Sequence, residues 1–420
     1  MHYKKIDEIT NISELTAAVI MHASVEIPFF IFPVILLLVG NDLFSDIDSI
    51  VWIGLGSIGT LGTLAAGLPA PIFGHWSEKM NYGSLMSISV VLAASGSLVI
   101  FLWGDIYFGL VLGMIILGIA LALYHPPGLA WVTKKFYDQE NNSYSTNYNK
   151  ALAFHGAGGT IGASIGPLSV YFLIEAFSWR EIYLLWVFPL ITIASLFWIL
   201  IGRKNLNQKL IPINHTKNTK IDQYSKYQAR NSRLVPLFGF IIAMSLSRGM
   251  INFIISPFLS ESKNFEITKA ALFIGVTTLL GIFGQLLGGI TGDRFSESIV
   301  LKINALLQAG IILLIYFLFG DIIILVLYIV LSMSNSIFWP STNSLIAKNT
   351  LKQSSAFGMV MFLANIVGAL GPLIDGIFLS WDLQKYLSIF IFASLCSLLA
   401  FLILWIFDLK VKRILPHAAK

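Results

Sequence analysis

Long apolar stretches separated by short polar turns repeat along almost the whole of this 420-residue chain. A helix that crosses the ~30 Å hydrocarbon core of a bilayer needs about 20 mostly apolar residues. Twelve stretches reach that length, and they lie near residues 13–40, 48–74, 84–103, 106–131, 148–176, 181–202, 234–260, 268–291, 299–319, 321–346, 354–380 and 385–408. The pattern predicts an all-α integral membrane protein with twelve transmembrane helices.

The composition agrees with a chain that has lipid as its solvent. It is 56% hydrophobic and only 12% charged, against about 25% charged in soluble domains, and its mean hydropathy is +0.79. The first stretch follows a polar start with Lys4 and Lys5, but it is too long for a signal-peptide core. We therefore expect it to be retained. Cys396, the single cysteine, lies in the last predicted helix and leaves no intramolecular disulfide.

The basic residues fall on alternate loops of the predicted topology. One set of loops carries Lys4, Lys5, Lys79, Lys134, Lys135, Lys150, eight cations from Arg203 to Arg233, Arg294, Lys302, Lys348, Lys352 and the basic tail. The other set carries Arg180, Lys263, Lys269 and Lys385. Because basic loops stay in the cytoplasm, both termini are predicted there, in a multi-pass protein of the cell membrane. Topology also accounts for the net charge of +5 without a nucleic-acid partner.

Several short motifs recur about 200 residues apart. The polar segment 203–233 is predicted to be a cytoplasmic linker that divides the chain into residues 1–202 and 234–420. The recurring motifs are Gly74-x-x-x-Glu78-Lys79 with Gly289-x-x-x-Asp293-Arg294, His125-Pro126 with Trp339-Pro340, and Gly166-Pro167-Leu168 with Gly371-Pro372-Leu373. They predict two pseudo-symmetric six-helix bundles.

Glycines gather in corresponding helices of the two halves. Gly158, Gly162 and Gly166 recur every four residues and share one helical face, and Gly368 and Gly371 lie in the eleventh predicted helix. Small faces let helices touch closely. Ordinary helix packing and a sliding interface between the halves both remain open for these glycines, and for Pro167 and Pro372 beside them.

The doubled turn resembles the signature of the major facilitator superfamily, Gly-x-x-x-Asp-Arg-x-Gly-Arg-Arg, which follows the second helix and is echoed after the eighth. Only its front half is present here, since the trailing glycine and basic residues are missing at 81–83 and 296–298. The resemblance implies transport by alternating access. It also implies a conformational latch made by Gly74, Glu78, Lys79, Gly289, Asp293 and Arg294.

Further motifs are similar to fosmidomycin-resistance-type exporters within that superfamily. They are His22-x-x-x-Glu26, Tyr124-His125-Pro126, the glycine run from Gly158 to Pro167, and Arg248 before Pro257. The arginine that drug–proton antiporters carry in the fourth helix aligns with Met114. Their usual apparatus for proton coupling is therefore not expected here.

Ionisable residues inside predicted helices are the candidates for substrate binding or proton coupling: His22, Glu26, His125, His155, Arg248 and Asp375. An ionised group at the bilayer centre costs on the order of 2.5–3.5 kcal/mol, so it faces a cavity or a partner. His22 and Glu26 are four residues apart and share a helical face. The alternatives are a structural His22–Glu26 pair and packing roles for His125 and His155.

Arg248 has no acidic neighbour on its own helix, so its partner must come from elsewhere. Glu26 is the expected partner, and an anionic substrate bound by two parallel hydrogen bonds is the other. Asp375 follows Gly371-Pro372 toward the end of its helix, where we expect a gate or cap.

Motifs of enzymes and ATP-driven pumps are missing from the sequence, which has no phosphate-binding Gly-Lys-Ser/Thr loop, no metal-spaced Cys or His pairs and no nucleophile elbow. We expect a non-enzyme without cofactor or metal, whose partners are a small-molecule substrate, protons or another coupling ion, and the lipid bilayer. The first hypothesis is a proton-coupled exporter that works as a monomer. The second is an uptake symporter or facilitator for a small anionic metabolite, and the third is a non-transporting membrane sensor, which the latch motifs in both halves disfavour.

Overall fold

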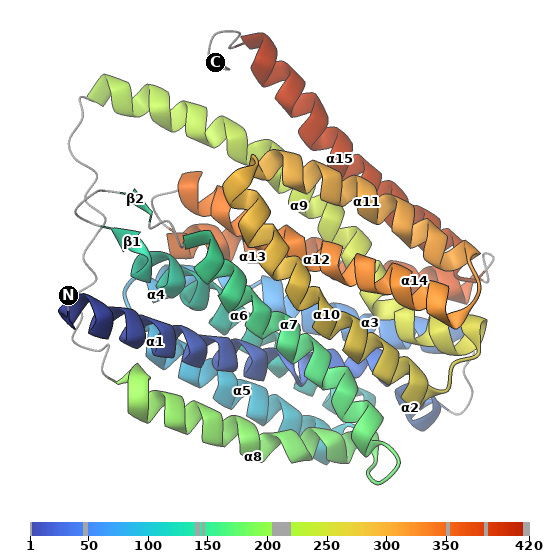
Figure 1. Ribbon diagram of the computed structural model, residues 1–420. Coiled ribbons are helices and arrows are strands. Elements are labelled where there is room, and N and C mark those ends of the chain that lie inside the picture. Colours follow the sequence, from blue (N-terminus) through green and yellow to red (C-terminus); the bar gives the residue numbers. More distant parts are fainter. Residues whose placement is uncertain are drawn as a thin grey trace.

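A computed structural model of the chain describes residues 2–44, 49–138, 143–144, 148–203, 220–349, 353–381 and 385–414. Nearly all of these residues are helical (Figure 1). The all-α fold expected from the sequence is confirmed.

The elements of the first half are α1 (His2–Glu26), η1 (Phe29–Val34), α2 (Leu36–Leu43), α3 (Ser49–Gly67), α4 (Ala70–Ser77), α5 (Tyr82–Trp103), α6 (Tyr107–Lys135), β1 (Tyr137–Asp138), β2 (Ser143–Tyr144), α7 (Tyr148–Leu173), α8 (Trp179–Phe197) and the π-helical turn η2 (Trp198–Gly202). The two short strands pair antiparallel. The elements of the second half are α9 (Lys220–Lys263), α10 (Ile267–Arg294), α11 (Glu297–Phe317), α12 (Asp321–Asn349), α13 (Gln353–Gly368), α14 (Leu370–Ser380) and α15 (Leu387–Ile414).

Within the described ranges, ten helices are long and apolar enough to cross a membrane. They coincide with ten of the twelve predicted stretches. The stretch 13–40 instead breaks into α1, η1 and α2, because Pro28 and Pro33 lack the N–H that an α-helix needs. The stretch 148–176 forms the continuous helix α7, whose glycines and polar residues lower its hydropathy.

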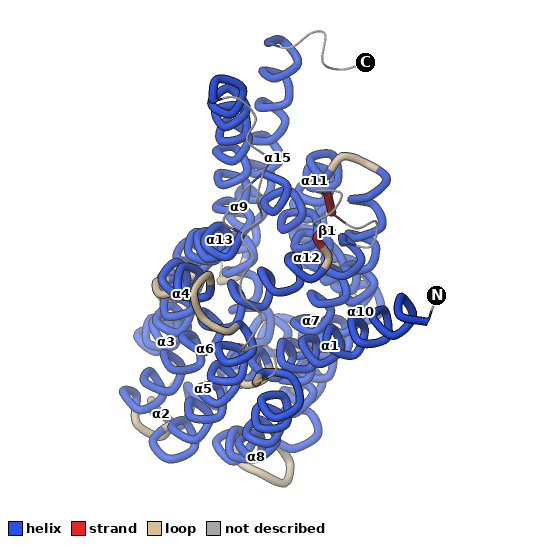
Figure 2. Tube along the Cα trace, turned by 90° about the vertical axis from the view of Figure 1, so that its left-hand side faces the viewer, coloured by secondary structure: helices blue, strands red, loops and turns tan. Residues whose placement is uncertain are grey.

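The same helix pairs pack together in the two halves. α5 packs on α6 and α8, α3 on α6, and α1 on α7; correspondingly, α11 packs on α12 and α15, α10 on α12, and α9 on α13. Figures 1 and 2 place α1, α5 and α8 on one side of the molecule and α9, α11 and α15 on the other. This recurrence follows the repeat in the sequence.

Two long joints connect the halves, one between α7 and α10 and the other between the α3–α4 pair and the α13–α14 pair. The second joint has two ends. The one where α4 stops and α13 starts is called the basic end, and the opposite one is called the far end. A Cβ on Gly74 would come within 2.6 Å of the Ser354 carbonyl oxygen at the basic end. One on Gly376 would come within 2.6 Å of the Trp52 carbonyl oxygen at the far end. Both ends of the joint are therefore in backbone contact.

The glycine stripe of α7 packs inside the first half. A Cβ on Gly158 would lie 2.5 Å from the carbonyl oxygen of Val19, and one on Gly166 would lie 2.7 Å from that of Ile27, while Gly162 sits equally tightly on Ala23. All three contacts are with α1 and the residue after it. In the second half, a Cβ on Gly371 would lie 2.6 Å from the backbone of α9, whereas one on Gly368 would lie 3.4 Å from the Ser245 carbonyl oxygen of the same helix, an ordinary contact. These glycines therefore pair helices within each half, whereas Pro372 faces α3 across the joint.

The linker expected at 203–233 lies only partly within the described residues. Residues 204–219 are outside them. Residues 220–233 continue α9 as one helix of 44 residues, which extends past its apolar segment (Figure 1).

Candidate functional site

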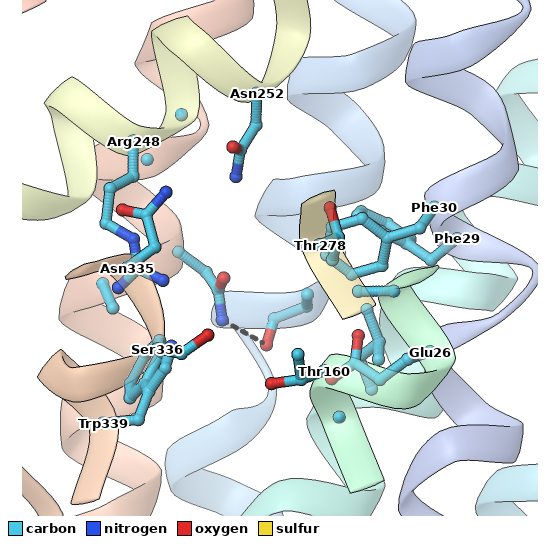
Figure 3. Close-up of a pocket in the computed structure, with 18 of the residues that line it drawn as sticks. Glu26, Phe29, Phe30, Thr160, Arg248, Asn252, Thr278, Asn335, Ser336 and Trp339 are labelled. Atoms are coloured by element: carbon cyan, nitrogen blue, oxygen red, sulfur yellow. Dashed lines mark hydrogen bonds between the residues drawn. The ribbon is translucent and has the colours of Figure 1, made fainter. Parts of the chain in front are cut away.

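A cavity of about 360 Å³ lies between the halves. The first half lines it from α1, η1, α3, α6 and α7, and the second half from α9, α10, α12, α13 and α14. Its volume is in the range of small-molecule sites in proteins. Figure 3 shows that the side chains of its two walls face one another across the opening, with Glu26 on one wall and Arg248 on the other.

Glu26 and His125 form the charged centre of the first wall. Glu26 is the last residue of α1, placed there because Pro28 follows, and His125 lies on α6 immediately before two prolines. The Nε2 atom of His125 lies 3.0 Å from Glu26 Oε1. The Nδ1 atom of the same ring donates to the carbonyl oxygen of Leu121 at 2.8 Å.

These contacts indicate that the pair shares a proton. A carbonyl oxygen only accepts, so Nδ1 of His125 carries a hydrogen. The 3.0 Å contact between Nε2 and the carboxylate then needs one further proton, shared as imidazolium with carboxylate or as neutral imidazole with carboxylic acid. Without that proton, a lone pair would face an anion. The pair is therefore a one-proton store on the cavity wall.

His22 adds a second imidazole to Glu26. Its Nε2 lies 3.5 Å from Glu26 Oε1, and its Nδ1 donates to the carbonyl oxygen of His155 at 2.9 Å. Its ring stacks on Tyr124 with centroids 5.1 Å apart, and the Tyr124 hydroxyl donates to Ala18 at 2.7 Å. The expected His22–Glu26 pair is therefore formed, and it is held in place from α6 and α7.

His155 lies directly behind His22. The two rings stack with centroids 4.8 Å apart, and His155 is 1% exposed. Neither of its ring nitrogens has a hydrogen-bond partner in the described residues. The three histidines expected as separate candidates thus form one cluster around Glu26.

Arg248 is the charged centre of the opposite wall. Its guanidinium carbon lies 4.8 Å from the ring centroid of Phe338 and 5.2 Å from that of Trp339, both on α12. Glu26 is bonded to the two histidines, so the expected Glu26–Arg248 ion pair is not formed. Among the described residues, no carboxylate lies within ion-pair distance of Arg248. A guanidinium held only by rings and open to a cavity has its planar donors free for an anion.

Amide groups surround Arg248 on the same wall. Asn335 lies beside it, and Asn252 lies above it (Figure 3). The carbonyl oxygens of the Asn335, Asn343 and Gln285 side chains are buried without a hydrogen-bond donor in the described structure. Amide groups therefore line the second wall together with Arg248, while these three carbonyl oxygens have almost no exposed surface.

Asp375 lies apart from this cavity. It is fully buried on α14, and its side chain does not line the cavity. The structure thus separates Asp375 from the five other candidates.

Of the residues expected to form a latch, Glu78 of the first half makes a contact with the second half. Oε1 of Glu78 accepts hydrogen bonds from both the backbone N–H and the hydroxyl of Ser355, in the first turn of α13. Lys79 and Arg294 are exposed, and Gly289 is buried in α10. The side chain of Asp293 lies outside the described residues. The copy of the turn that carries Glu78 therefore joins the two halves at the basic end.

A metal ion is the other ligand that the first wall could accept. The ligand atoms of His22, Glu26 and His125 lie within 4.8 Å of one another. One shared proton already accounts for the 3.0 Å contact between His125 and Glu26. We therefore treat the cluster as a proton site.

Sequence reasoning missed the aromatic and amide residues of the cavity. Phe29 and Phe30 face it from η1, and Trp339 faces it from α12, while the buried ring of Phe338 lies under Arg248. Only Trp339 could have been found from the sequence, because the repeat aligns it with the candidate residue His125. The repeat therefore points to matched positions in the two walls.

Comparisons with known proteins agree with this architecture. The family model described as Major Facilitator Superfamily matches residues 15–372 and 237–419. A search of curated proteins returned no match.

Solved structures of two transporters share the fold. The human organic anion transporter MFSD10 (TETRAN) superposes with a TM-score of 0.65 at 16% identity, over 93% of this chain and 99% of that one. A bacterial homolog of the human lysosomal transporter Spinster, in an inward-facing and unoccupied conformation, gives 0.65 at 13% identity, over 95% and 98%. Together with the family match, these results show that this chain belongs to the Major Facilitator Superfamily of multi-pass membrane transporters.

Proposed function

We propose that this protein is a proton-coupled exporter of a small organic molecule, which works by alternating access to the central cavity. The observation that carries the proposal is the Glu26–His125 pair, which holds one proton on the cavity wall. A proton acceptor in direct reach of the substrate space lets binding of the substrate and binding of the proton influence each other.

The topology that we propose is twelve membrane crossings in two pseudo-symmetric six-helix bundles, residues 1–202 and 234–420, joined by a cytoplasmic linker at 203–233. The recurring helix pairs support it, with α1, η1 and α2 together making the first crossing and α7 the fifth. The basic end then faces the cytoplasm, with both termini, in the cell membrane. A monomer holds both walls of the cavity and suffices for the cycle.

A proton gradient supplies enough energy for this work. One proton that moves through 100 mV releases about 2.3 kcal/mol. At about 1.4 kcal/mol per tenfold concentration ratio, this sustains a solute gradient of roughly fortyfold. One-to-one coupling through the Glu26–His125 pair is therefore sufficient.

Proteoliposomes loaded with a panel of small organic molecules test the proposal. With the lumen acidic, we expect protons that leave the lumen to drive substrate into it. The same direction is expected for protein inserted in either orientation. Reversing the pH gradient should reverse the flux. The Glu26→Gln variant should lose the response to pH while still exchanging substrate. Flux in wild-type protein that ignores the imposed pH gradient would contradict proton coupling. Substrate moving in the same direction as protons would contradict exchange.

The second candidate function is uptake of a small anionic metabolite, with the proton moving in the same direction. Arg248 favours an anion, because its guanidinium faces the cavity and no described carboxylate pairs with it. One structural neighbour is described as an organic anion transporter. The direction of export rests only on the resemblance of the histidine and glycine motifs to fosmidomycin-resistance-type exporters. The direction of flux relative to the pH gradient, measured with anionic and neutral members of the panel, separates the two functions.

A further inference from the structure

Asp375 is a buried carboxyl group that the proposed cycle does not use. Its exposure is 0%, and neither carboxyl oxygen has a hydrogen-bond partner in the described structure. It lies on α14 near the far end and does not line the cavity. A buried polar group without a partner costs free energy, and the cost is much larger if the group is charged.

The helices around Asp375 are packed too closely to bring water to it. A Cβ on Gly371 would lie 2.6 Å from the backbone of α9, and one on Gly376 would lie 2.6 Å from the carbonyl oxygen of Trp52 on α3. Gly56 of α3 is in equally close contact with the carbonyl oxygen of Pro372. The segment that carries Asp375 is thus wedged between α9 and the other half of the protein.

The charged groups on the neighbouring helices have partners elsewhere. α3 and α13 contain no charged residue. On the described part of α9, Arg248 stacks on Phe338 and Trp339, Glu261 bonds Lys385 and Tyr386, and Lys263 bonds the Tyr316 and Leu318 carbonyls. Asp408 of α15 is held by Lys302. No described cation is therefore placed to neutralise Asp375.

A proton is the one ligand that a single carboxyl group can bind without further help. A metal cation needs several oxygen ligands, and Asp375 has no bonded neighbour in the described structure that supplies one. We propose that Asp375 is a second proton-binding site, filled while the far end of the α3–α14 joint is closed and emptied when that end opens and water reaches the carboxylate. The proposal rests on the alternating access of the proposed function.

The closed joint and the proton therefore stabilise each other. Since the closed form binds one proton more than the open form, raising the pH favours the open form. For one linked proton, the ratio of open to closed protein rises by at most about tenfold per pH unit.

Distances between spin labels at the far end test this inference. Ile50 at the start of α3 and Trp381 after α14 are exposed, so Ile50→Cys and Trp381→Cys can carry the labels in a Cys396→Ala background. In the purified protein, we expect the long-distance population to grow as the pH is raised from about 6 to about 8, a range above the ordinary pKa of an exposed aspartate. Asp375→Asn and Asp375→Ala should both keep the short distance and lose the pH response.

Two control variants separate this site from others. Asp105→Asn makes the same change at an exposed aspartate beside Arg180 and should leave the pH response intact. His75→Gln removes an exposed imidazole of α4 that titrates in the same pH range, and it should also leave the far-end response in place. A wild-type protein without a pH response, or a response that persists in both Asp375 variants, would overturn the proposal. Because the measurement needs no substrate, it stands apart from transport assays, whose failure would count against the proposed function alone.

Discussion

Glu26 and Arg248 stand at matching places on the two cavity walls. Glu26 is bonded to His125 of α6, and Arg248 stacks on Trp339 of α12. The repeat aligns His125-Pro126 with Trp339-Pro340. The first half thus holds a group that gains and loses a proton, whereas the second half holds a permanent cation. Under the proposed function, this division would give proton coupling to one wall and recognition of an anion to the other.

Replacing His125 by glutamine should uncouple transport from pH. Glutamine can still donate a hydrogen bond to Glu26, but it cannot carry the shared proton. We expect proton-driven transport to fall at least about tenfold, a loss of about 1.4 kcal/mol, with a flattened pH profile in proteoliposomes. His75→Gln, at an exposed position on α4, is the matched control. A His125→Gln variant with the wild-type pH profile would remove this residue from the coupling mechanism.

Replacing Arg248 by lysine tests the second wall. Lysine keeps the charge but has neither the planar fork nor the flat face that stacks on Phe338 and Trp339. For anionic substrates we expect binding weaker by roughly tenfold, about 1.4 kcal/mol, and an unchanged pH profile. Affinity is measured by titration calorimetry, with Arg180→Lys in the first turn of α8, outside the cavity, as the control. Equal affinity in the Arg248→Lys variant would exclude recognition by a guanidinium.

The sequence was most informative about single helices and least informative about contacts between them. The spacing of His22 and Glu26 predicted a shared face, and the structure confirms the contact at 3.5 Å. The prediction that Glu26 pairs with Arg248 was wrong. Which residue pairs with Arg248 depends on how α9, α1 and α12 are rotated against one another. Apolar periodicity does not encode that rotation. The aromatic residues of the cavity were missed as well. Aromatic side chains also face lipid, so only the rotation of a helix shows which of them face the cavity.

At the level of elements, α1 and α7 behave as one packed pair. Gly162 lies directly against the carbonyl oxygen of Ala23. A Cβ on Gly162 would lie 2.7 Å from the Cβ of Glu26. The close approach of the two helices therefore also sets where Glu26 stands in the cavity. The sequence predicted the small face of α7, but not that it packs within its own half.

A methyl group at Gly162 should separate this pair. Overpacking of this kind costs about 1–3 kcal/mol, so we expect Gly162→Ala to lower the thermal unfolding temperature in detergent and to weaken the Glu26–His125 contact. Gly310→Ala is the matched control, because nothing lies within 4 Å of a Cβ there and alanine favours the helix. Equal unfolding temperatures for the two variants would mean that the α1–α7 contact can relax.

At the scale of the whole molecule, the basic end and the far end of the α3–α14 joint must not open together. Glu78 closes the basic end by accepting two hydrogen bonds from Ser355 in the first turn of α13, where the helix dipole favours a negative charge. The tight glycines around Asp375 close the far end. Transport then requires that each closure be lost in turn, so both contacts act on populations of states and neither touches the substrate.

Removing Glu78 should therefore change the rate of the cycle and not the affinity for substrate. Hydrogen bonds to a charged group contribute about 1.5–3 kcal/mol, so Glu78→Ala should raise the population open at the basic end by roughly tenfold or more. Spin labels at the exposed positions Trp76 on α4 and Met359 on α13 would report this as a longer distance. Glu14→Ala, which breaks an ion pair with Lys135 inside the first half, should leave that distance unchanged. A Glu78→Ala variant with weaker substrate binding but normal turnover would place Glu78 in recognition, because a contact that only biases the two states shifts turnover first.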